Sequence, residues 1–310
     1  MSVTARRSLD KPIVRPDMDG RMGRNINGPS LIAAPPWLAR PLARYYLYFA
    51  DHRGSYIRLA LAERIEGPWR MHEAGCLELA DALFCAERPT PPGPPPAGTA
   101  PGEDWLYPHV ASPDVHVEPA EQRVRMYFHG LMADGSQTTR LALSEDGLRF
   151  EVRPEVLGPP YFRVFRHGRR TYAHASRNRL FRSADGLGGF EAGPTIFDPA
   201  TRHAALAVLG DRLHVFWTRI GDAPERILHA RAALSADWAD WRLTEARELL
   251  RPEHSWEGAE LALRPSARGA SDAPANQLRD PCVFEEGGRT WLLYAAAGEC
   301  AIGLAELEGL

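Results

Sequence analysis

The stretch that decides the fold is residues 112–150, SPDVHVEPAEQRVRMYFHGLMADGSQTTRLALSEDGLRF. Its run VRMYF, residues 124–128, is short, apolar and aromatic, which is typical of a β-strand. A second strand-like run, TTRLALSE, follows after a polar turn, and then Asp146-Gly147 leads to the aromatic Phe150. A turn residue followed by an aromatic is what a hairpin into a further strand needs. The stretch therefore predicts a meander of antiparallel strands.

The same pattern recurs along the chain, and such self-similarity marks a repeat architecture. The first aromatic-rich runs are YYLYFA (45–50), VRMYF (124–128), TYAHAS (171–176), LHVFWTR (213–219) and TWLLYAAAG (290–298). The runs that follow them are YIRLALAE (56–63), TTRLALSE (138–145), NRLFRSAD (178–185), RILHARAAL (226–234) and AIGLAELE (301–308). An inner strand precedes each pair, beginning near residues 27, 112, 160, 202 and 279. The separations of the three middle starts lie within the roughly 40–50 residues that one propeller blade needs.

These five copies predict an all-β protein with a single five-bladed β-propeller, of about four antiparallel strands per blade. We expect an N-terminal arm over residues 1–26 and the propeller over residues 27–310, with insertions at about 70–106 and 250–276. The first insertion contains the low-complexity loop PTPPGPPPAGTAP, residues 89–101. Helical periodicity is weak, so at most a short helix near residues 74–85 is expected.

Composition and net charge limit the classes of partner that we expect this protein to bind. The 310 residues carry 37 Lys+Arg and 40 Asp+Glu, a formal charge of −3, with 44% hydrophobic residues. These are globular values, and a near-zero charge gives no electrostatic reason to expect nucleic acid or an anionic membrane as a partner. No apolar stretch approaches a membrane span, and the N-terminal region lacks the apolar core of a secretory signal. We therefore expect a cytoplasmic protein.

The four cysteines, Cys76, Cys85, Cys282 and Cys300, form no C-x-x-C pair, and no histidine spacing resembles a zinc site. Buried or idle thiols in a reducing cytosol are the preferred interpretation, with disulfides left open. No cofactor or metal is implied, although a structural cation in the channel is compatible with the fold. The oligomeric state is left open.

Polar residues occur where the inner strands begin, and these strands line the central channel of a propeller. They are Asn27, Asp114, Arg163, His203 and Asp280. Each residue alone is explained equally well as a turn or strand-start residue. Convergence of several of them on one channel is typical of a binding pocket.

Other polar residues follow the first aromatic runs, at positions that are either the channel rim or ordinary turns. They are Asp51, His52, Arg53, His129 and Glu299. His109 and His116 flank Asp114, where metal ligation by the three is one interpretation and a hydrogen-bonding cluster is the commoner one. Glu257 and Glu260 lie in the second insertion, and long insertions in compact folds are often functional.

Several of these motifs resemble glycoside hydrolase family 43. They are Ser112-Pro113-Asp114-Val115, Arg279-Asp280-Pro281, the YYLYFA run, and the Ser-x-Asp-Gly segment ending at Phe150. The wider resemblance is to the five-bladed arabinanase, xylosidase, levansucrase and invertase superfamily, and it covers most of the chain as a repeat pattern. It implies a pocket with a first-blade Asp base, a second-blade Asp that tunes pKa and orientation, and a later Glu acid.

Asp114 matches the second-blade position of this family. The first blade departs from the pattern, because Asn27-Gly28-Pro29 offers no Asp, and an amide cannot act as a general base. The third blade reads Pro160-Tyr161-Phe162-Arg163 and offers no Glu. The carboxylates available as replacements are Asp51, Glu257, Glu260 and Asp280.

The resulting hypothesis is a glycoside hydrolase-like protein that cleaves a small saccharide, with an inverting mechanism between carboxylates roughly 6.5–9.5 Å apart. Asp114 orients and tunes, Asp280 or Asp51 activates water, and Glu257 or Glu260 is the acid. The expected substrate-binding residues are His52, Arg53, His109, His129, Arg163, His203 and Arg279, with Tyr161 and Trp256 stacking on a sugar ring. The alternative is a catalytically degenerate sugar-binding or protein-interaction propeller.

Overall fold

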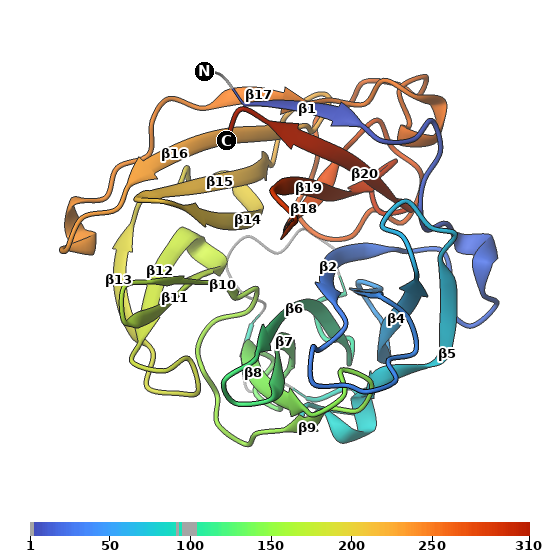
Figure 1. Cartoon of the computed structure of the whole chain (residues 1–310). Coiled ribbons are helices and arrows are strands. Elements are labelled where there is room, and N and C mark those ends of the chain that lie inside the picture. The colour runs from blue at the N-terminus through green and yellow to red at the C-terminus, as the bar shows by residue number, and fades with distance from the viewer. Residues whose placement is uncertain (1–2, 91–92, 95–103) are drawn as a thin grey trace.

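The computed structural model describes residues 3–90, 93–94 and 104–310 and shows a five-bladed β-propeller around a central channel (Figure 1). Five four-stranded antiparallel sheets form the blades. The predicted fold class is confirmed, and so is the resemblance to the five-bladed superfamily at the level of fold.

The first strand of blades one to four is innermost, and later strands follow outwards. Blade one holds β2 (Asn27–Ala33), β3 (Tyr45–Ala50), β4 (Tyr56–Ala62) and β5 (Arg70–Glu78). Blade two holds β6 (Val110–Glu118), β7 (Arg123–Leu131), β8 (Gln137–Ser144) and β9 (Glu151–Val152). Blade three holds β10 (Arg163–His167), β11 (Arg170–Ala175), β12 (Arg179–Ser183) and β13 (Glu191–Thr195). Blade four holds β14 (Thr201–Leu209), β15 (Arg212–Arg219), β16 (Ile227–Ala233) and β17 (Arg247–Leu250).

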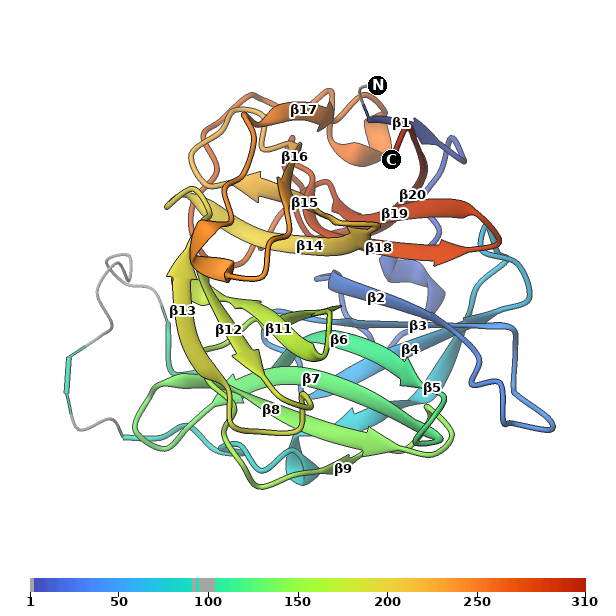
Figure 2. The ribbon, with the colours of Figure 1, turned by 60° about the vertical axis from the view of Figure 1, so that its left-hand side comes forward.

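Blade five combines the two ends of the described chain. Its strands are β18 (Arg279–Glu286), β19 (Arg289–Ala296), β20 (Ala301–Glu308) and the N-terminal β1 (Thr4–Arg7). The register of β1 on β20 runs from Thr4 opposite Glu308 to Arg7 opposite Ala305. Figures 1 and 2 both show the termini side by side at this blade. Part of the segment expected as an arm thus supplies the outermost strand of the fifth blade and closes the ring.

Short 3₁₀ turns join some of these strands. They are η1 (Pro16–Met18), η2 (Leu79–Asp81), η3 (Ser176–Asn178), η4 (Trp238–Asp240) and η5 (Ser255–Glu257). The short helix expected near residues 74–85 is not formed, because β5 continues to Glu78 and only the single turn η2 follows. Most of the Pro-rich loop expected at residues 89–101 lies outside the described residues. In the part of the chain that is described, no helix is long and apolar enough to cross a membrane.

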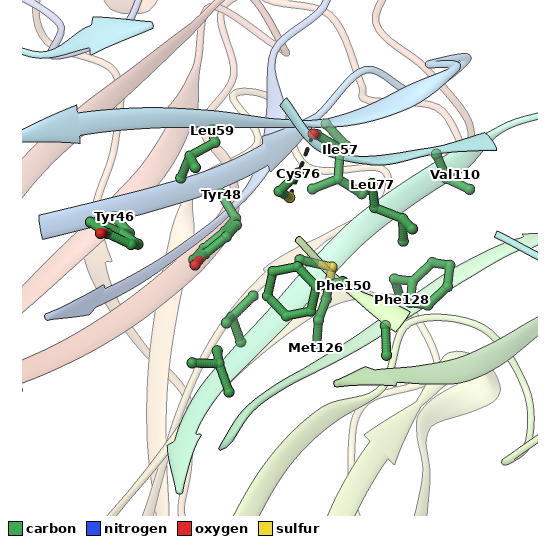
Figure 3. Close-up of a cluster of buried hydrophobic side chains, with 14 of the residues drawn as sticks. Tyr46, Tyr48, Ile57, Leu59, Cys76, Leu77, Val110, Met126, Phe128 and Phe150 are labelled. Atoms are coloured by element: carbon green, nitrogen blue, oxygen red, sulfur yellow. Dashed lines mark hydrogen bonds between the residues drawn. The ribbon is translucent and has the colours of Figure 1, made fainter. Parts of the chain in front are cut away.

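Hydrophobic side chains fill the space between neighbouring blades. Figure 3 shows the cluster between blades one and two, where Tyr46, Tyr48 and Ile57 face Met126 and Phe128. All four cysteines are free thiols, and burial raises the pKa of Cys76 in this cluster well above its usual value. The cluster is continuous across the blade boundary, so it fixes the angle between the two sheets.

The Asp-Gly turns of blades two and three each join their blade to the one before it. Tyr48 in blade one donates its hydroxyl to the carbonyl of Gly147 at 2.7 Å, and Tyr127 in blade two donates to Gly186 at 2.9 Å. Gly147 has a φ of +75°, and a Cβ there would lie 2.8 Å from the Tyr48 hydroxyl oxygen. Only glycine therefore suits this turn, which explains why the Ser-x-Asp-Gly pattern recurs.

A bulge at the start of several inner strands turns their first residues towards the channel. Positive φ values occur at Gly28 (+57°), Ser112 (+51°) and Asp280 (+46°). The strand registers shift at the same places, between Asn27 and Ser30, Ala111 and Asp114, and Arg279 and Cys282. Bulges re-aim side chains in this way, often next to functional sites. The three blades therefore present their bulge residues to one end of the channel.

Candidate functional site

The inner strands all begin at the same end of the channel, where polar side chains converge on a narrow depression that their own atoms largely fill. We call it the upper pocket. Its lining residues are Asn27, His52, His109, Ala111, Ser112, His129, Tyr161 and His203. Six of these eight were expected as site residues or as polar residues at the strand starts, so the structure brings that part of the predicted set together.

A buried carboxylate–imidazole pair lies at the upper pocket, with its imidazole, His203, in the pocket lining. Oδ1 of Asp280 in β18 is in close contact with Nδ1 of His203 in β14, and the Gly28 N–H lies 3.4 Å from Asp280 Oδ2. Asp280 is 1% exposed. Burial lowers the pKa of His203 well below its usual value, and the charges of Arg163 and Arg202 add to this. The imidazole is therefore neutral, with Nδ1–H donating to Asp280 and the lone pair on Nε2.

An array of rings extends from His203 around the pocket. The centroid separations are 4.5 Å from His203 to Tyr161, 4.2 Å from Tyr161 to His129, 5.4 Å from His129 to His109 and 4.8 Å from His109 to Tyr107. Burial lowers the pKa of His109 to about 4 and that of His129 well below the usual value. Neutral imidazoles offer one donor and one acceptor each. The wall is thus polar and uncharged, which suits hydroxyl groups.

A buried ion network supports the pocket from behind. Glu299 Oε1 lies 2.8 Å from an Arg279 nitrogen, and Glu299 Oε2 accepts from the amides of Asn25 (2.7 Å) and Asn27 (3.2 Å). His52 Nδ1 lies 3.8 Å from the same Oε2. Burial acts to raise the pKa of Glu299, but His52, Arg279 and the two amides hold it below its usual value. Glu299 therefore stays ionised and fixes the amide of Asn27.

The same network includes residues that were not among the candidate site residues predicted from the sequence. Glu225 is completely buried and accepts from Arg202 Nε at 2.8 Å and from Thr218 Oγ1 at 2.6 Å, and it lies 3.4 Å from Arg279 Nε. The repeat marks Arg202 only as the start of an inner strand and does not mark Glu225, because their roles depend on partners elsewhere in the fold. Arg279 was expected to bind substrate, and the structure places its guanidinium among these carboxylates.

Asp114 lies further along the channel, outside the lining of the upper pocket. Its Oδ2 accepts from His116 Nε2 at 2.8 Å and from the Val164 N–H at 2.7 Å. Burial acts to raise the pKa of Asp114, but His116, Arg163 and the Val164 N–H keep it below the usual value. The carboxylate thereby joins β6 to β10. The hydrogen-bonding interpretation of the Asp114–His116 pair agrees with this geometry.

Arg163 lies between Asp114 and the upper pocket. One of its terminal nitrogens donates to the carbonyls of Ser112 (3.1 Å) and Pro113 (2.9 Å), and it is 4.0 Å from Asp114 Oδ1. The side chain is 7% exposed. Arg163 thus connects blades three and two and faces His203 on one side and Asp114 on the other.

The carboxylates of the second insertion lie away from the upper pocket. Glu257 is completely buried and binds Arg7 of β1 through both oxygens at 2.8 Å. Tyr294 also donates to it at 2.8 Å, and Trp256 stacks against Tyr294 at 6.4 Å. Burial acts to raise the pKa of Glu257, but Arg7, two backbone N–H groups and Tyr294 hold it below its usual value. Glu260 is exposed. This geometry gives Glu257 and Trp256 a place in blade five instead of the channel.

Asp51 and Arg53 sit in the turn after β3. Asp51 accepts from the Arg53 N–H at 2.7 Å and from an Arg58 guanidinium nitrogen at 3.1 Å. The exposed Arg53 guanidinium lies 5.1 Å from the ring centre of Tyr107. Arg53 is therefore at the rim, whereas Asp51 holds the turn. Across the described ranges, no group of three or more His, Cys, Asp or Glu residues is arranged to hold a metal ion.

Comparison with known proteins gives a relative in sequence and several in fold. No protein-family model matches the chain. The chain is 34% identical over 309 residues to a protein of Acanthamoeba polyphaga mimivirus named "Uncharacterized protein R118", covering 91% of this chain and 83% of that one.

Two solved structures illustrate the fold. A family 43 β-xylosidase/α-arabinofuranosidase from a compost microbial metagenome, in complex with xylotriose, superposes with a TM-score of 0.59 at 11% identity, over 98% of this chain and 95% of that one. An N-acetylgalactosamine deacetylase from F. plautii, in complex with blood group B trisaccharide, gives 0.56 at 11% identity over 97% and 95%. At these identities the similarity is one of fold.

Proposed function

Since the chain belongs to the same family as the mimivirus protein R118 and shares the fold of family 43 glycoside hydrolases, we propose that it hydrolyses a small glycoside or saccharide in the upper pocket. The observation that carries this proposal is the Asp280–His203 pair. It combines a buried carboxylate with a neutral imidazole at the end of the channel where the inner strands begin. Such a pair accepts a proton from a bound water.

In the proposed reaction, water adds to the anomeric carbon of the sugar while His203 Nε2 takes the water proton. Asp280 holds the imidazole in the required tautomer and stabilises the imidazolium that forms, as carboxylates do in hydrolytic triads. The glycosidic bond breaks, and the leaving oxygen carries away the electron pair. Asp280 thus activates water through His203, while Arg279 and Glu299 hold the surrounding network.

This site differs from the usual two-carboxylate scheme in its lack of a suitable general acid among the described residues. A general acid needs a carboxyl with a raised pKa, whereas Glu299 and Glu257 both have a lowered pKa. The leaving group therefore departs with little assistance. We expect the enzyme to favour leaving groups that are stable as anions, so 2,4-dinitrophenyl glycosides should react faster than simple alkyl glycosides.

Recognition of the sugar rests on the uncharged wall. His109, His129, Asn27 and Ser112 supply donors and acceptors for hydroxyl groups, and the Tyr161 ring offers a face for stacking on a sugar ring. Uncharged polar groups around a small pocket favour a neutral sugar of one ring over a charged or polymeric one.

The proposal is tested with a panel of 2,4-dinitrophenyl and 4-nitrophenyl pentosides and hexosides. Wild type should release the phenol, and His203→Gln and Asp280→Asn should each lower kcat/KM by about 10²- to 10⁴-fold. His72→Gln on β5 and Asp211→Asn, whose side chain is 84% exposed, are the matched controls and should keep wild-type rates. Equal rates in wild type and His203→Gln would reject the assigned base.

Binding without cleavage is the second candidate, and the first blade favours it. The first-blade stretch Asn27-Gly28-Pro29 lacks the family's Asp, and at Gly28 (φ +57°) a Cβ would lie 3.1 Å from Ser112 Cα. Calorimetric titration with xylose, arabinose and their short oligomers decides between the two. Saturable binding of one equivalent, with no release from any glycoside in the panel, selects the binding module.

A further inference from the structure

A second and larger cavity occupies the opposite end of the channel. The inner strands run in the same direction around the ring, so their later residues gather at the end away from the upper pocket. The cavity there has a volume of about 470 Å³, and we call it the lower cavity. Most of its wall is aliphatic, with contributions from all five inner strands. Examples are Leu31, Val115, Val164, Leu206 and Val283.

Such a volume is unusual for a site with a purely structural role. Protein interiors are packed as densely as organic crystals and keep few voids larger than a water molecule. Small-molecule sites, by contrast, are concave, mostly apolar and about 300–1,000 Å³ in volume, with a few polar groups that orient the ligand. The lower cavity matches the second description in both size and lining.

Some charged side chains around the lower cavity have hydrogen-bond or ion-pair partners, and one has none in the described part of the chain. Asp114 is paired with His116 and the Val164 N–H, and Arg163 donates to two backbone carbonyls. Glu285 lines the same cavity at its rim. Its side chain is exposed, no hydrogen bond or ion pair within the described ranges reaches it, and the partial desolvation of its carboxyl group raises its pKa. A carboxylate in this position attracts a cation, because a cation favours the ionised form that burial opposes.

From these observations we propose that the lower cavity binds a small apolar molecule that carries a protonated amine. The apolar body lies against the aliphatic walls, and the ammonium group pairs with Glu285. A sugar fits poorly, because aliphatic walls leave its hydroxyl groups without partners, and burying an unpaired hydroxyl is costly. An anion fits poorly as well, because the cavity is lined by two carboxylates, Asp114 and Glu285, and by one guanidinium, Arg163, of which one terminal nitrogen already donates to two backbone carbonyls.

This site is independent of the upper pocket. Arg163 lies between the two and holds the carbonyls of Ser112 and Pro113. Cys282 also lines the lower cavity, but burial raises the pKa of its thiol to about 12, so it offers no thiolate there. The expected event is therefore reversible binding with no covalent step.

The test uses three probes of the same shape and different charge: 1-naphthylmethylamine, 1-naphthalenemethanol and 1-naphthoic acid. Calorimetric titration of the full chain at pH 7 should show one equivalent of the amine bound about tenfold more tightly than the alcohol, with the acid weakest. Glu285→Gln should lower the affinity for the amine to that for the alcohol and leave the affinity for the alcohol unchanged. Glu73→Gln, an exposed carboxylate on β5, is the matched control.

A second variant tests the location. Ala33→Trp places a large ring in the lower cavity and should abolish binding of both the amine and the alcohol, whereas the exposed Ala80→Trp should not. Glycoside release or sugar binding at the upper pocket should persist in Ala33→Trp and in Glu285→Gln, so failure here is separate from failure of the proposed function. Equal binding of the amine and the acid, or amine binding that is unaffected by Glu285→Gln, would overturn the proposal.

Discussion

Replacement of Glu257 should destabilise the propeller without removing a catalytic group. The carboxylate accepts from Arg7 at 2.8 Å through each oxygen, from Tyr294 at 2.8 Å, and from the N–H groups of Glu253 (2.8 Å) and His254 (3.1 Å). Its exposed fraction is 0%, and that of Arg7 is 11%. These contacts fasten β1 to blade five, so they close the ring of blades.

The size of the effect follows from what the substitution leaves behind. Glu257→Ala strands the Arg7 guanidinium in a mostly buried position, and breaking a buried ion pair in this way costs about 3–5 kcal/mol. Glu257→Gln keeps the shape and an acceptor for Tyr294 but loses the charge. Its cost should be about 1.5–3 kcal/mol, the range for hydrogen bonds to charged groups. Urea unfolding, followed by the change in midpoint at constant slope, measures both.

The pH dependence gives an independent check on the same group. Arg7 and the other donors hold the pKa of Glu257 below its usual value, so the stabilisation is present at neutral pH. It is lost as the pH falls through the folded pKa, which lies below the unfolded value of about 4.3. The stability difference between wild type and Glu257→Gln should therefore persist from pH 8 to 5 and shrink in more acidic solution.

Reduced turnover at unchanged stability would contradict this structural role of Glu257. If Glu257 were a general acid, Glu257→Gln would lower kcat by about 10²-fold or more at unchanged stability. We expect the reverse, with reduced stability and an unchanged rate per folded molecule. Glu260→Gln is the matched control, since this exposed residue of the same insertion should change neither quantity.

Three further predictions address the site and the blade contacts. The pKa of His203 lies well below its usual value, so the imidazole loses its basic form only in acid. We therefore expect kcat/KM to stay constant from pH 8 to below 6.5. A decrease in kcat/KM with an apparent pKa of 6.5 or above would contradict the assignment. Gly28→Asp restores a first-blade Asp but should not raise turnover, and it should cost about 1–2 kcal/mol in urea unfolding, because φ is +57° and the new Cβ would lie 3.1 Å from Ser112 Cα. Tyr48→Phe removes the hydrogen bond to the Gly147 carbonyl and should cost about 1 kcal/mol by the same measurement, with no change indicating that the blade contact is not stabilising.

The repeat could be predicted from the sequence because its signals are local. Aromatic strands, polar turns and the Asp-Gly step at residue 147 are each set by neighbours within a few residues, and their recurrence identifies the blades. The contribution of β1 to blade five is a long-range pairing between Thr4–Arg7 and the far end of the described chain. Nothing in the composition of a four-residue strand specifies its partner, so the segment was expected only as an arm.

The site was predictable in its residue types but only partly in its partners. His203, Asp280, His129 and Tyr161 stand at strand starts and ends, where a propeller directs side chains to the channel. Asp114 and Asp280 are equally strong candidates on sequence grounds, since both belong to short motifs that resemble the family. Their different surroundings depend on which strand faces them: β10 supplies the Val164 N–H to Asp114, and β14 supplies the His203 imidazole to Asp280.

The low pKa values of the histidines explain how, in the proposed reaction, one of them becomes the base while the others bind hydroxyl groups. His109 and His129 are buried near other imidazoles and no carboxylate among the described residues acts on their pKa values, so a proton on either one would have no counter-charge. His52 has Glu299 at 3.8 Å, but that carboxylate already receives Arg279 and two amides. Asp280 contacts His203 directly, so an imidazolium formed there during turnover has a dedicated counter-charge. In the proposed reaction, proton transfer therefore concentrates at His203, and the remaining imidazoles recognise hydroxyl groups.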